Sequence, residues 1–312
     1  MLEKLQSCVI RFLNTTSSLP NDQLLVHHQI FSHVHMLSGI IREAEEAKLS
    51  KSNILEVLKP VRKLYAQSPF IAHLQTWPRG YPGDFEAIEY ICENTISACP
   101  GTPAFYLEYH ALNSIAAQQH RNKIHWQSKC IQEGVLSEQK TRILSIACGS
   151  SRDIQEIGES LNNTDVLFFL NDADSNALQY SLCQLESIRS KIKLIPGNVF
   201  RSIRSFQTYK PFHRILAGGL FDYLTDRQLE WLIPKLIDLL HVDGVMCFTN
   251  IGNGNPDRIF MEYIADWHIT ERNEADIERI VDNSCDLGKI DLNIERDFTG
   301  LTLLVKLKKV SS

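Results

Sequence analysis

A turn of small residues at positions 147–151 is the strongest candidate for a segment that holds a ligand. It reads Ala147-Cys148-Gly149-Ser150-Ser151 and follows an apolar run. Because these side chains are small, the backbone can pass close to a bulky ligand. A turn that binds the pyrophosphate of a nicotinamide dinucleotide would carry three glycines spaced G-x-G-x-x-G. Gly149 is the single glycine here, so the turn predicts a different kind of ligand.

An acidic residue stands at the end of the next apolar run. Asp172 follows the run 166–171, and a carboxylate in that position can accept hydrogen bonds from the hydroxyl groups of a ribose. Asp174 is suited to capping the N-terminus of a helix, and capping is the alternative role for Asp172 as well. Because Asp172 falls at the strand end itself, ribose binding is the favoured interpretation.

Two further strand ends carry residues that suit a nucleoside. Asn198 follows the run 192–196 and can form hydrogen bonds with an adenine edge, while Val199 can pack on the ring. The run 213–218 ends in Gly218, and Leu220 begins the following helix. In a parallel sheet the carboxyl ends of the strands share one edge, so these strand ends predict one site of nucleoside size.

The elements that must position these residues alternate after residue 140. Short runs rich in Ile, Leu, Val and Phe alternate with polar segments long enough for helices, which is typical of βαβ units. Strands are predicted at 142–147, 166–171, 192–196, 213–218, 244–250, about 291–296 and 301–308. The last two favour an antiparallel hairpin. The predicted fold class is α/β: a Rossmann-like, doubly wound, mostly parallel sheet of seven strands.

The first 140 residues have a helical pattern. Their apolar residues recur at spacings of three and four, which indicates amphipathic helices. Helices are predicted at 22–47, 50–66, 84–98 and 103–133, with Asp84 available as the cap of the third. We therefore expect a helical cap or substrate domain at 1–138 and a ligand-binding domain at 139–312.

Composition and charge exclude several classes of protein. The chain has 312 residues, of which 44% are hydrophobic, enough for about two domains. Its net charge of -5 disfavours a dedicated nucleic-acid partner. No apolar run approaches the roughly 18 residues of a membrane span. The amino-terminal residues lack the pattern of a secretory signal, so cytoplasmic localisation is expected.

Cysteines and histidines predict neither disulfides nor a metal site. The eight cysteines include no C-x-x-C pair. Four histidines cluster at His27, His28, His33 and His35, but no acidic residue lies near them in the sequence. Solvated histidines, or histidines at the edge of a core, are therefore expected in place of metal ligands.

Residues 140–308 resemble the class I S-adenosylmethionine-dependent methyltransferases. The first motif of that family reads acidic-x-G-x-G-x-G, and Ser145, Ala147, Gly149 and Ser151 occupy its defined positions here. The resemblance implies S-adenosyl-L-methionine as the cofactor. In the family the acidic residue helps to orient the amino group of the methionine moiety, a contact that Ser145 does not supply. The cofactor-binding residues implied are Cys148, Gly149, Ser150, Asp172, Ala173, Asn198, Val199, Gly218, Leu220, Tyr223 and Arg121, the last as a partner of the cofactor carboxylate or as an exposed residue.

A narrower resemblance comes from two segments outside that motif. Two segments resemble a bacterial group that makes 3-hydroxypalmitic acid methyl ester, an extracellular signal. They are the loop 78–84, Pro-Arg-Gly-Tyr-Pro-Gly-Asp, and the segment from Asn250 to Arg258 with Glu262, Asp266, Trp267 and Arg272 after it. This resemblance implies a small-molecule acceptor, with O-methylation of a carboxylate such as a 3-hydroxy fatty acid. The loop residues Arg79, Tyr81 and Asp84 suit a surface that covers a ligand, although the loop could serve only as a connector.

The chemistry of the acceptor decides which side chains are needed. Methyl transfer from a sulfonium requires the reacting atoms to be held in line. A carboxylate needs only orienting donors such as Arg79 and Tyr81, whereas a hydroxyl or amine needs a base, for which His110 and His268 are candidates. Packed or solvated histidines are the alternative. Substrate-binding candidates are Asp84, Tyr106, Tyr109, Asn250 and Trp267.

Two other functions remain open from the sequence. The first is O- or N-methylation of another specialised metabolite with a histidine base. The second is a non-catalytic ligand-binding or assembly protein that retains the methyltransferase fold, which the departures at Ser145, Ala147 and Ser151 would suit. The oligomeric state is not predicted.

Overall fold

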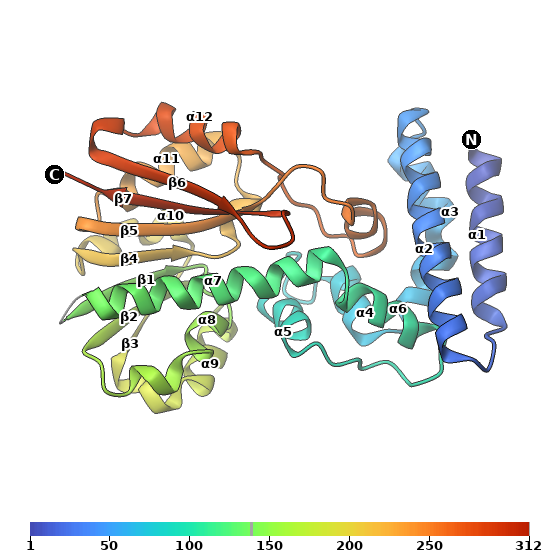
Figure 1. Ribbon diagram of the computed structural model, residues 1–312, viewed down its shortest axis with the longest axis horizontal. Helices are drawn as coiled ribbons and strands as arrows, with labels where there is room; N and C mark the ends of the chain where they lie inside the picture. The colour runs from blue at the N-terminus through green and yellow to red at the C-terminus, as the bar shows by residue number, and fades with distance from the viewer. Residues whose placement is uncertain (138–139, 312) are drawn as a thin grey trace. The chain divides into compact units, whose positions relative to one another are not determined.

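The structure, a computed structural model, describes residues 1–137 and 140–311 (Figure 1). Its chain divides into two compact units. The first comprises Met1–Gln118 and Pro256–His268, and the second comprises Gln119–Asn255 and Ile269–Ser312. A division of the chain into compact units does not identify its functional domains. The assignment of 1–138 and 139–312 as functional domains therefore stays a prediction.

The second unit contains one sheet of seven strands in the order β3-β2-β1-β4-β5-β7-β6. The strands are β1 (Thr141–Ile146), β2 (Val166–Asp172), β3 (Ile192–Pro196), β4 (Phe212–Ala217), β5 (Leu240–Ile251), β6 (Ile290–Arg296) and β7 (Thr302–Lys309). Strands β1 to β5 pair in parallel, and β7 is antiparallel to both β5 and β6. Strands β2 and β3 lie on one side of β1, whereas β4 and β5 lie on the other side. In sheets of this kind, ligands bind beyond the carboxyl ends of the strands at the point where the order changes sides, here between β1 and β4.

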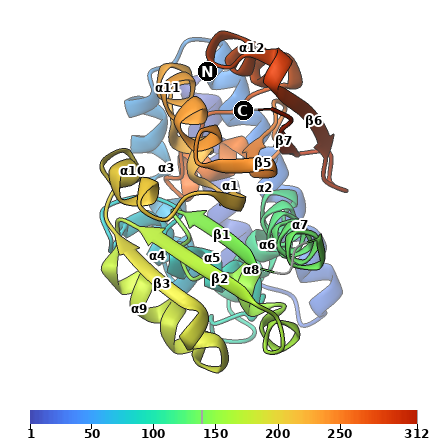
Figure 2. The same cartoon turned by 90° about the vertical axis from the view of Figure 1, so that its left-hand side faces the viewer.

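Helices cover both faces of this sheet, as Figure 2 shows. Three of them, α10 (Val199–Gln207), α11 (Asp226–Ile237) and α12 (Glu274–Ser284), share one core with Leu144 and Ile146 of β1. The other core contains Ile143 of β1 with residues of α7 (Ile115–Ser137), α8 (Arg152–Gln155) and α9 (Ser175–Gln184). Successive strand residues point to opposite faces, so both faces need apolar side chains, which explains the nearly continuous apolar runs. The predicted Rossmann-like α/β fold with a helical N-terminal region is confirmed.

The first unit is helical. Its helices are α1 (Leu2–Ser17), α2 (Gln23–Glu46), α3 (Lys51–Tyr65), α4 (Pro69–Thr76), α5 (Phe85–Glu93) and α6 (Pro103–Leu112), together with the beginning of α7. The segment 256–268, which follows β5 in sequence, belongs to the same unit. Arg62 Nη1 donates to the Tyr263 carbonyl at 2.6 Å, and Gln75 Nε2 donates to the Ile264 carbonyl at 2.8 Å.

The helical prediction needs three corrections. Helices α1 and α4 were not predicted. The helix predicted at 103–133 is two helices, because α6 ends at Leu112 and the Ser114 hydroxyl accepts a hydrogen bond from the Ala117 N–H at 3.1 Å, which begins α7. The helix predicted at 84–98 ends at Glu93, where Asn94 adopts a left-handed conformation with φ of 50°. In the part of the chain that the structure describes, no helix is both long enough and apolar enough to cross a membrane.

Candidate functional site

In the turn between β1 and α8, every second residue has a backbone conformation in the left-handed region. The φ angles are 46° at Ala147, 54° at Gly149 and 56° at Ser151. Residues other than glycine rarely adopt this backbone conformation, because the Cβ atom makes it cost about 1–2 kcal/mol per residue. These are the three positions at which the methyltransferase motif has glycine, so the backbone has the shape that glycines would allow even though two of them are replaced.

Asp172 connects this turn to the end of β2. One of its carboxylate oxygens accepts a hydrogen bond from the Gly149 N–H at 2.8 Å, and the other accepts one from the Asp174 N–H at 2.8 Å. The residue is 7% exposed, and burial raises the pKa of its carboxyl group. Asp174, in turn, caps α9 through a bond from the Asn176 N–H at 2.8 Å, as its position suggested. Asp172 therefore fixes the turn and does not cap the helix.

Cys148, Ser150 and Ala173 lie in the same two segments. Burial and the Asp172 carboxylate raise the pKa of the Cys148 thiol well above its usual value, so this cysteine is protonated at neutral pH. Ser150 is buried and Ala173 is exposed. Cys148 therefore lacks the character of a nucleophile.

The end of β3 is joined to the end of β2 by a residue that the sequence did not single out. The side-chain amide of Asn171 donates to the carbonyls of Ile195 at 2.7 Å and Gly197 at 2.8 Å. Asn198 caps α10, with its side-chain oxygen accepting from the Phe200 N–H at 3.0 Å. Val199 is 4% exposed and belongs to the core between α10 and the sheet. The predicted packing of Val199 on a ligand ring stays a prediction.

The end of β4 lies against α7. A Cβ atom on Gly218 would stand 2.4 Å from Gln127 Oε1, so a larger residue there would displace the Gln127 side chain. One turn earlier in α7, Lys123 Nζ lies 3.6 Å from Asp222 Oδ2, and both side chains are at most 5% exposed. Asp222 also accepts the Ile251 N–H at 2.7 Å. Sequence reasoning missed this buried ion pair, since no local motif connects the two residues.

The other predicted cofactor residues of this unit are less enclosed. Leu220 packs at the edge of the core, Tyr223 is 40% exposed, and Arg121 is half-buried on α7. The structure thus brings Cys148, Gly149, Asp172, Asn198 and Gly218 to the carboxyl ends of β1 to β4, as predicted.

Asn250, a predicted substrate-binding residue, has a structural role. Its amide donates to the carbonyls of Ile251 and Thr270, and its oxygen accepts from Arg272 Nη1 at 2.7 Å. Arg272 is 2% exposed and also binds the carbonyls of Phe221 and Leu224 and the Asp226 carboxylate. Asn250 and Arg272 therefore fasten the segment after β4 to β5.

The loop at 78–84 contains an ordered polar network in the helical unit. Asp84 caps α5, as expected, and also pairs with His73 Nε2 at 2.8 Å. Arg79 pairs with Glu86 at 2.6 Å and lies over the Phe85 ring. Tyr81 is 40% exposed.

His73, Asp84 and Glu86 each offer one ligand atom within 4.8 Å of the others, which makes them a candidate cation site that is empty. Asp84 is committed to the helix cap and to His73, and Glu86 is committed to Arg79. These bonds account for the cluster as an ion-pair network. Sequence reasoning predicted no metal, and it overlooked His73.

His110 lies among aromatic side chains of the helical unit. Its ring contacts Phe31 at 4.8 Å and His35 at 5.7 Å between centroids, and the residue is 9% exposed. Burial lowers the pKa of His110 to about 4. A histidine with this pKa is neutral at pH 7 but is a weak base, which favours the packed interpretation.

The aromatic candidates divide between core and surface. Tyr106 and Trp267 are each 4% exposed, and Tyr109 is 36% exposed and contacts His27. His268 is surface-located, 3.2 Å from Asp266. Within the helical unit, the predicted residues Tyr81, Tyr109 and His268 thus have exposed side chains.

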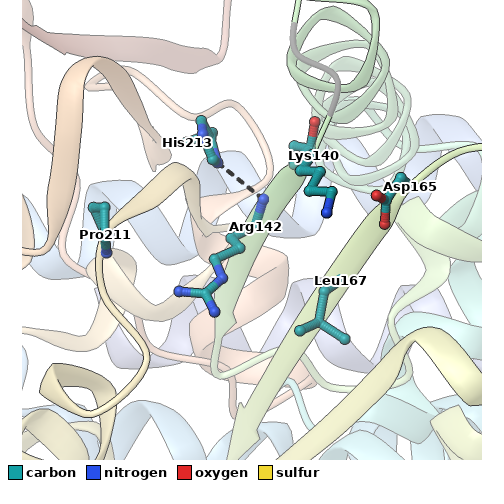
Figure 3. A pocket seen from close by; sticks show the side chains of 7 residues that line it. Lys140, Arg142, Asp165, Leu167, Pro211 and His213 are labelled. Carbon is teal, nitrogen blue, oxygen red and sulfur yellow. Dashed lines mark hydrogen bonds between the residues drawn. The ribbon is translucent and has the colours of Figure 1, made fainter.

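A hollow of about 360 Å³ lies at the amino ends of the strands, opposite the predicted nucleoside site (Figure 3). Its lining comes from the amino ends of β1, β2 and β4: Lys140, Thr141, Arg142, Asp165, Leu167, Pro211 and His213. The Arg142 N–H donates to His213 Nδ1 at 3.0 Å. Because ligands of doubly wound sheets bind at the carboxyl ends, this hollow is not assigned to the nucleoside site.

Known structures share the fold of this chain. No family model and no curated protein matches this sequence. A solved structure described as a possible exported protein from Bordetella parapertussis is 13% identical with a TM-score of 0.60, covering 99% of this chain and 96% of that chain. At this identity the likeness shows a shared fold alone.

Two other solved structures superpose less closely. Magnesium protoporphyrin IX methyltransferase from Synechocystis, solved with bound S-adenosylhomocysteine, is 10% identical, with a TM-score of 0.46 over 64% of this chain and 86% of that chain. The pyocyanin biosynthetic protein PhzM is 12% identical, with a TM-score of 0.48 over 82% of this chain and 72% of that chain.

Proposed function

We propose that this protein is an S-adenosylmethionine-dependent methyltransferase that acts on a small molecule. The observation that carries the proposal is the turn at 147–151, whose three left-handed residues coincide with the glycine positions of the class I motif. The sheet agrees with it, because a mostly parallel sheet with an antiparallel last pair is the Rossmann-like fold of these enzymes.

The donor and acceptor groups at the strand ends fit a nucleoside. Each carboxylate oxygen of Asp172 accepts one backbone N–H and has a second lone pair, with which it can accept from a ribose hydroxyl. The side-chain amide nitrogen of Asn198 is a donor at the adjacent strand end, since only its oxygen is used for the helix cap. S-adenosylmethionine would supply a methyl group on a sulfonium, and these residues would hold its nucleoside part.

We propose a carboxylate acceptor, such as that of a 3-hydroxy fatty acid. A carboxylate is ionised at neutral pH, so methyl transfer to it needs alignment and no general base. The low pKa of His110 supports this choice, because the base proposed for a hydroxyl or amine acceptor is a poor one. The helical half, with Tyr81, Tyr109 and Trp267, is proposed to supply acceptor-binding residues.

One observation favours a second candidate, methylation of a hydroxyl or amine. His73 is held by the Asp84 carboxylate at 2.8 Å, and a histidine oriented by a carboxylate is the usual form of a general base. This pair replaces His110 as the base to test.

The location we propose is the cytoplasm. All eight cysteines are free thiols, including the exposed Cys99 and Cys183, and free thiols are typical of a reducing compartment.

The acceptor class can be tested by the stability of the methylated product. We expect the protein, supplied with S-adenosylmethionine and long-chain 3-hydroxy fatty acids, to form products heavier by one methylene group that alkali hydrolyses, as a methyl ester requires. The His73→Gln and His110→Phe variants should retain activity within a few-fold. An alkali-stable ether, or loss of turnover in His73→Gln alone, would instead establish the hydroxyl or amine reaction, and cofactor binding without any product would establish a non-catalytic protein.

A further inference from the structure

Strand β6 forms one edge of the sheet, as Figure 2 shows, and within the described part of the chain it pairs with β7 alone. An edge strand presents a row of unpaired N–H and C=O groups, which lysine, proline or a bulge usually protects from pairing. The opposite edge strand, β3, contains Lys193 and Pro196. Strand β6 contains neither residue type, and its register with β7 is unbroken over seven residues. This edge is therefore open to pairing with a further strand.

The backbone groups at the outer side of β6 belong to its even-numbered residues. Before the strand, the Val310 N–H donates to the Lys289 carbonyl at 2.9 Å. After the strand, the Asp297 N–H donates to the Thr302 carbonyl at 2.9 Å. Hydrogen-bonded pairs alternate along an antiparallel ladder, so the odd-numbered residues from 289 to 297 bond to the β7 side. The residues whose N–H and C=O groups point away from β7 are Ile290, Leu292, Ile294 and Arg296.

A second copy of β6 fits this edge when the two strands are antiparallel and related by a two-fold axis at Leu292. Each Leu292 then lies opposite Leu292 of the other copy, and Ile290 lies opposite Ile294. Because all of these residues direct their backbone groups outward, each such pair can exchange both of its N–H···O bonds. Their side chains lie on the face of the sheet that packs on the core shared with α12, so apolar side chains meet across the strands.

The charged residues of β6 favour this register over its neighbours. With the axis at Leu292, Lys289 lies opposite Glu295 at both ends of the pair, and Asp291 lies opposite Asn293. An axis at Asn293 would place Asp291 opposite Glu295, and an axis at Asp291 would place the two Asp291 carboxylates opposite each other. Opposite charges directly across two strands are stabilising and like charges are destabilising, so the first register is selected.

Two exposed apolar side chains flank β6 along the chain. Leu287, shortly before the strand, is 53% exposed, and Phe298, in the turn after it, is 102% exposed. That turn is ordered, because the Asp297 carboxylate accepts the Thr302 N–H at 2.9 Å and the Thr299 hydroxyl at 2.8 Å. Antiparallel pairing brings the end of each β6 to the beginning of the other, so Phe298 of one copy would approach Leu287 of the other.

We propose that two copies of this chain pair through their β6 strands, antiparallel about Leu292, so that the two seven-stranded sheets become one continuous sheet. The outward backbone groups, the pairing of Lys289 with Glu295 and the exposed Phe298 all support a second copy as the occupant of this edge. The inference goes beyond the proposed function and does not depend on it, because none of these residues belongs to the predicted nucleoside site.

Analytical ultracentrifugation of the whole protein with charge-reversal variants tests the pairing. We expect the wild type to sediment as a dimer. Glu295→Lys and Lys289→Glu each place like charges opposite one another at both ends, so each should weaken dimerisation by about tenfold or more. The double variant, Lys289→Glu with Glu295→Lys, restores opposite charges and should return the dimer dissociation constant to within about threefold of the wild-type value.

Phe298→Ser changes a fully exposed side chain, so it tests the contact without disturbing the core. It should also weaken dimerisation, whereas the control Leu24→Ser, at a side chain that is 79% exposed on α2, should leave the dissociation constant unchanged. A wild type that remains monomeric would overturn the inference and leave a strand of a different protein as the occupant of this edge. A dimer that is unaffected by Glu295→Lys and Phe298→Ser, or that the double charge reversal does not restore, would overturn it as well. The proposed function is tested separately by cofactor binding, and none of these outcomes decides it.

Discussion

The turn at 147–151 shows that backbone shape can be retained when the residues that favour it are replaced. Ala147 and Ser151 adopt left-handed φ angles of 46° and 56° without being glycine. Strain of this kind persists only where the surrounding structure imposes it, and it concentrates at functional sites. Here the bond between Asp172 and the Gly149 N–H contributes to that constraint. The sequence predicted this turn as a candidate site, but its departures from the glycine motif concealed the backbone shape of the turn.

Relief of the strain should be measurable. We expect Ala147→Gly to raise the free energy of unfolding by about 1 kcal/mol, because glycine adopts a left-handed φ without a Cβ penalty. In contrast, Ala177→Gly, in the helix α9, should lower it by about 1 kcal/mol or more, because glycine is unfavourable inside helices and a buried methyl group is lost. Urea unfolding measures both, and destabilisation by Ala147→Gly as large as that by Ala177→Gly would contradict the account.

Asp153, the second residue of α8, should make stability depend on pH. Burial raises the pKa of this carboxyl group from 3.8 to about 6. A carboxyl whose pKa is raised by folding binds more protons in the folded state, so stability falls as pH rises from about 4 to about 6 and stays low above that range.

The Asp153→Asn variant removes this ionisation. It should exceed the wild type in free energy of unfolding by up to about 3 kcal/mol at pH 7.5. The two proteins should converge near pH 4, where the wild-type carboxyl is protonated. Thermal unfolding across this range is the measurement, and a difference that does not change with pH would refute the assignment.

At the scale of elements, two arginines that bind the same carboxylate should differ widely in their contribution to the free energy of unfolding. Arg272 binds Asp226 while 2% exposed, and Arg279 binds the same carboxylate from the surface at 2.8 Å. We expect Arg272→Met to lower the free energy of unfolding by about 3 kcal/mol or more, because it leaves Asn250 and two carbonyls without their buried donor. Arg279→Met should cost less than about 1 kcal/mol. Urea unfolding measures both values. Similar decreases in the free energy of unfolding of the two variants would be inconsistent with a buried Arg272 that holds the segment after β4 against β5.

The strands were easier to predict than the helices for a physical reason. Strands buried on both faces produce apolar runs, and the predicted run 166–171 became Val166–Asp172. Helix limits depend on single capping contacts, such as the bond to Ser114 that divides the predicted helix 103–133. Tertiary partners are harder still, and the roles of Asn250 and Lys123 follow from residues distant in sequence.

At the scale of the whole molecule, chain order and compact structure differ. The segment 256–268 lies between β5 and α12 in sequence but belongs to the helical unit, where Arg62, Gln75 and Trp77 bind its carbonyls. Trp267, taken from the sequence as part of the second domain, is therefore a residue of the helical unit. The predicted acceptor residues other than Asn250 all belong to that unit, and the predicted cofactor residues belong to the unit with the sheet.

The central claim is that the unit with the sheet binds a sulfur nucleoside through Asp172. Its most direct test is calorimetric titration of the whole protein with S-adenosylmethionine, S-adenosylhomocysteine and NAD, repeated on Asp172→Asn and on the control Asp174→Asn, which keeps a good helix cap. We predict micromolar binding of the two sulfur nucleosides, no binding of NAD, at least tenfold weaker binding in Asp172→Asn, and unchanged binding in the control. Absence of sulfur-nucleoside binding by the wild type, or equal affinity in Asp172→Asn, would contradict the claim.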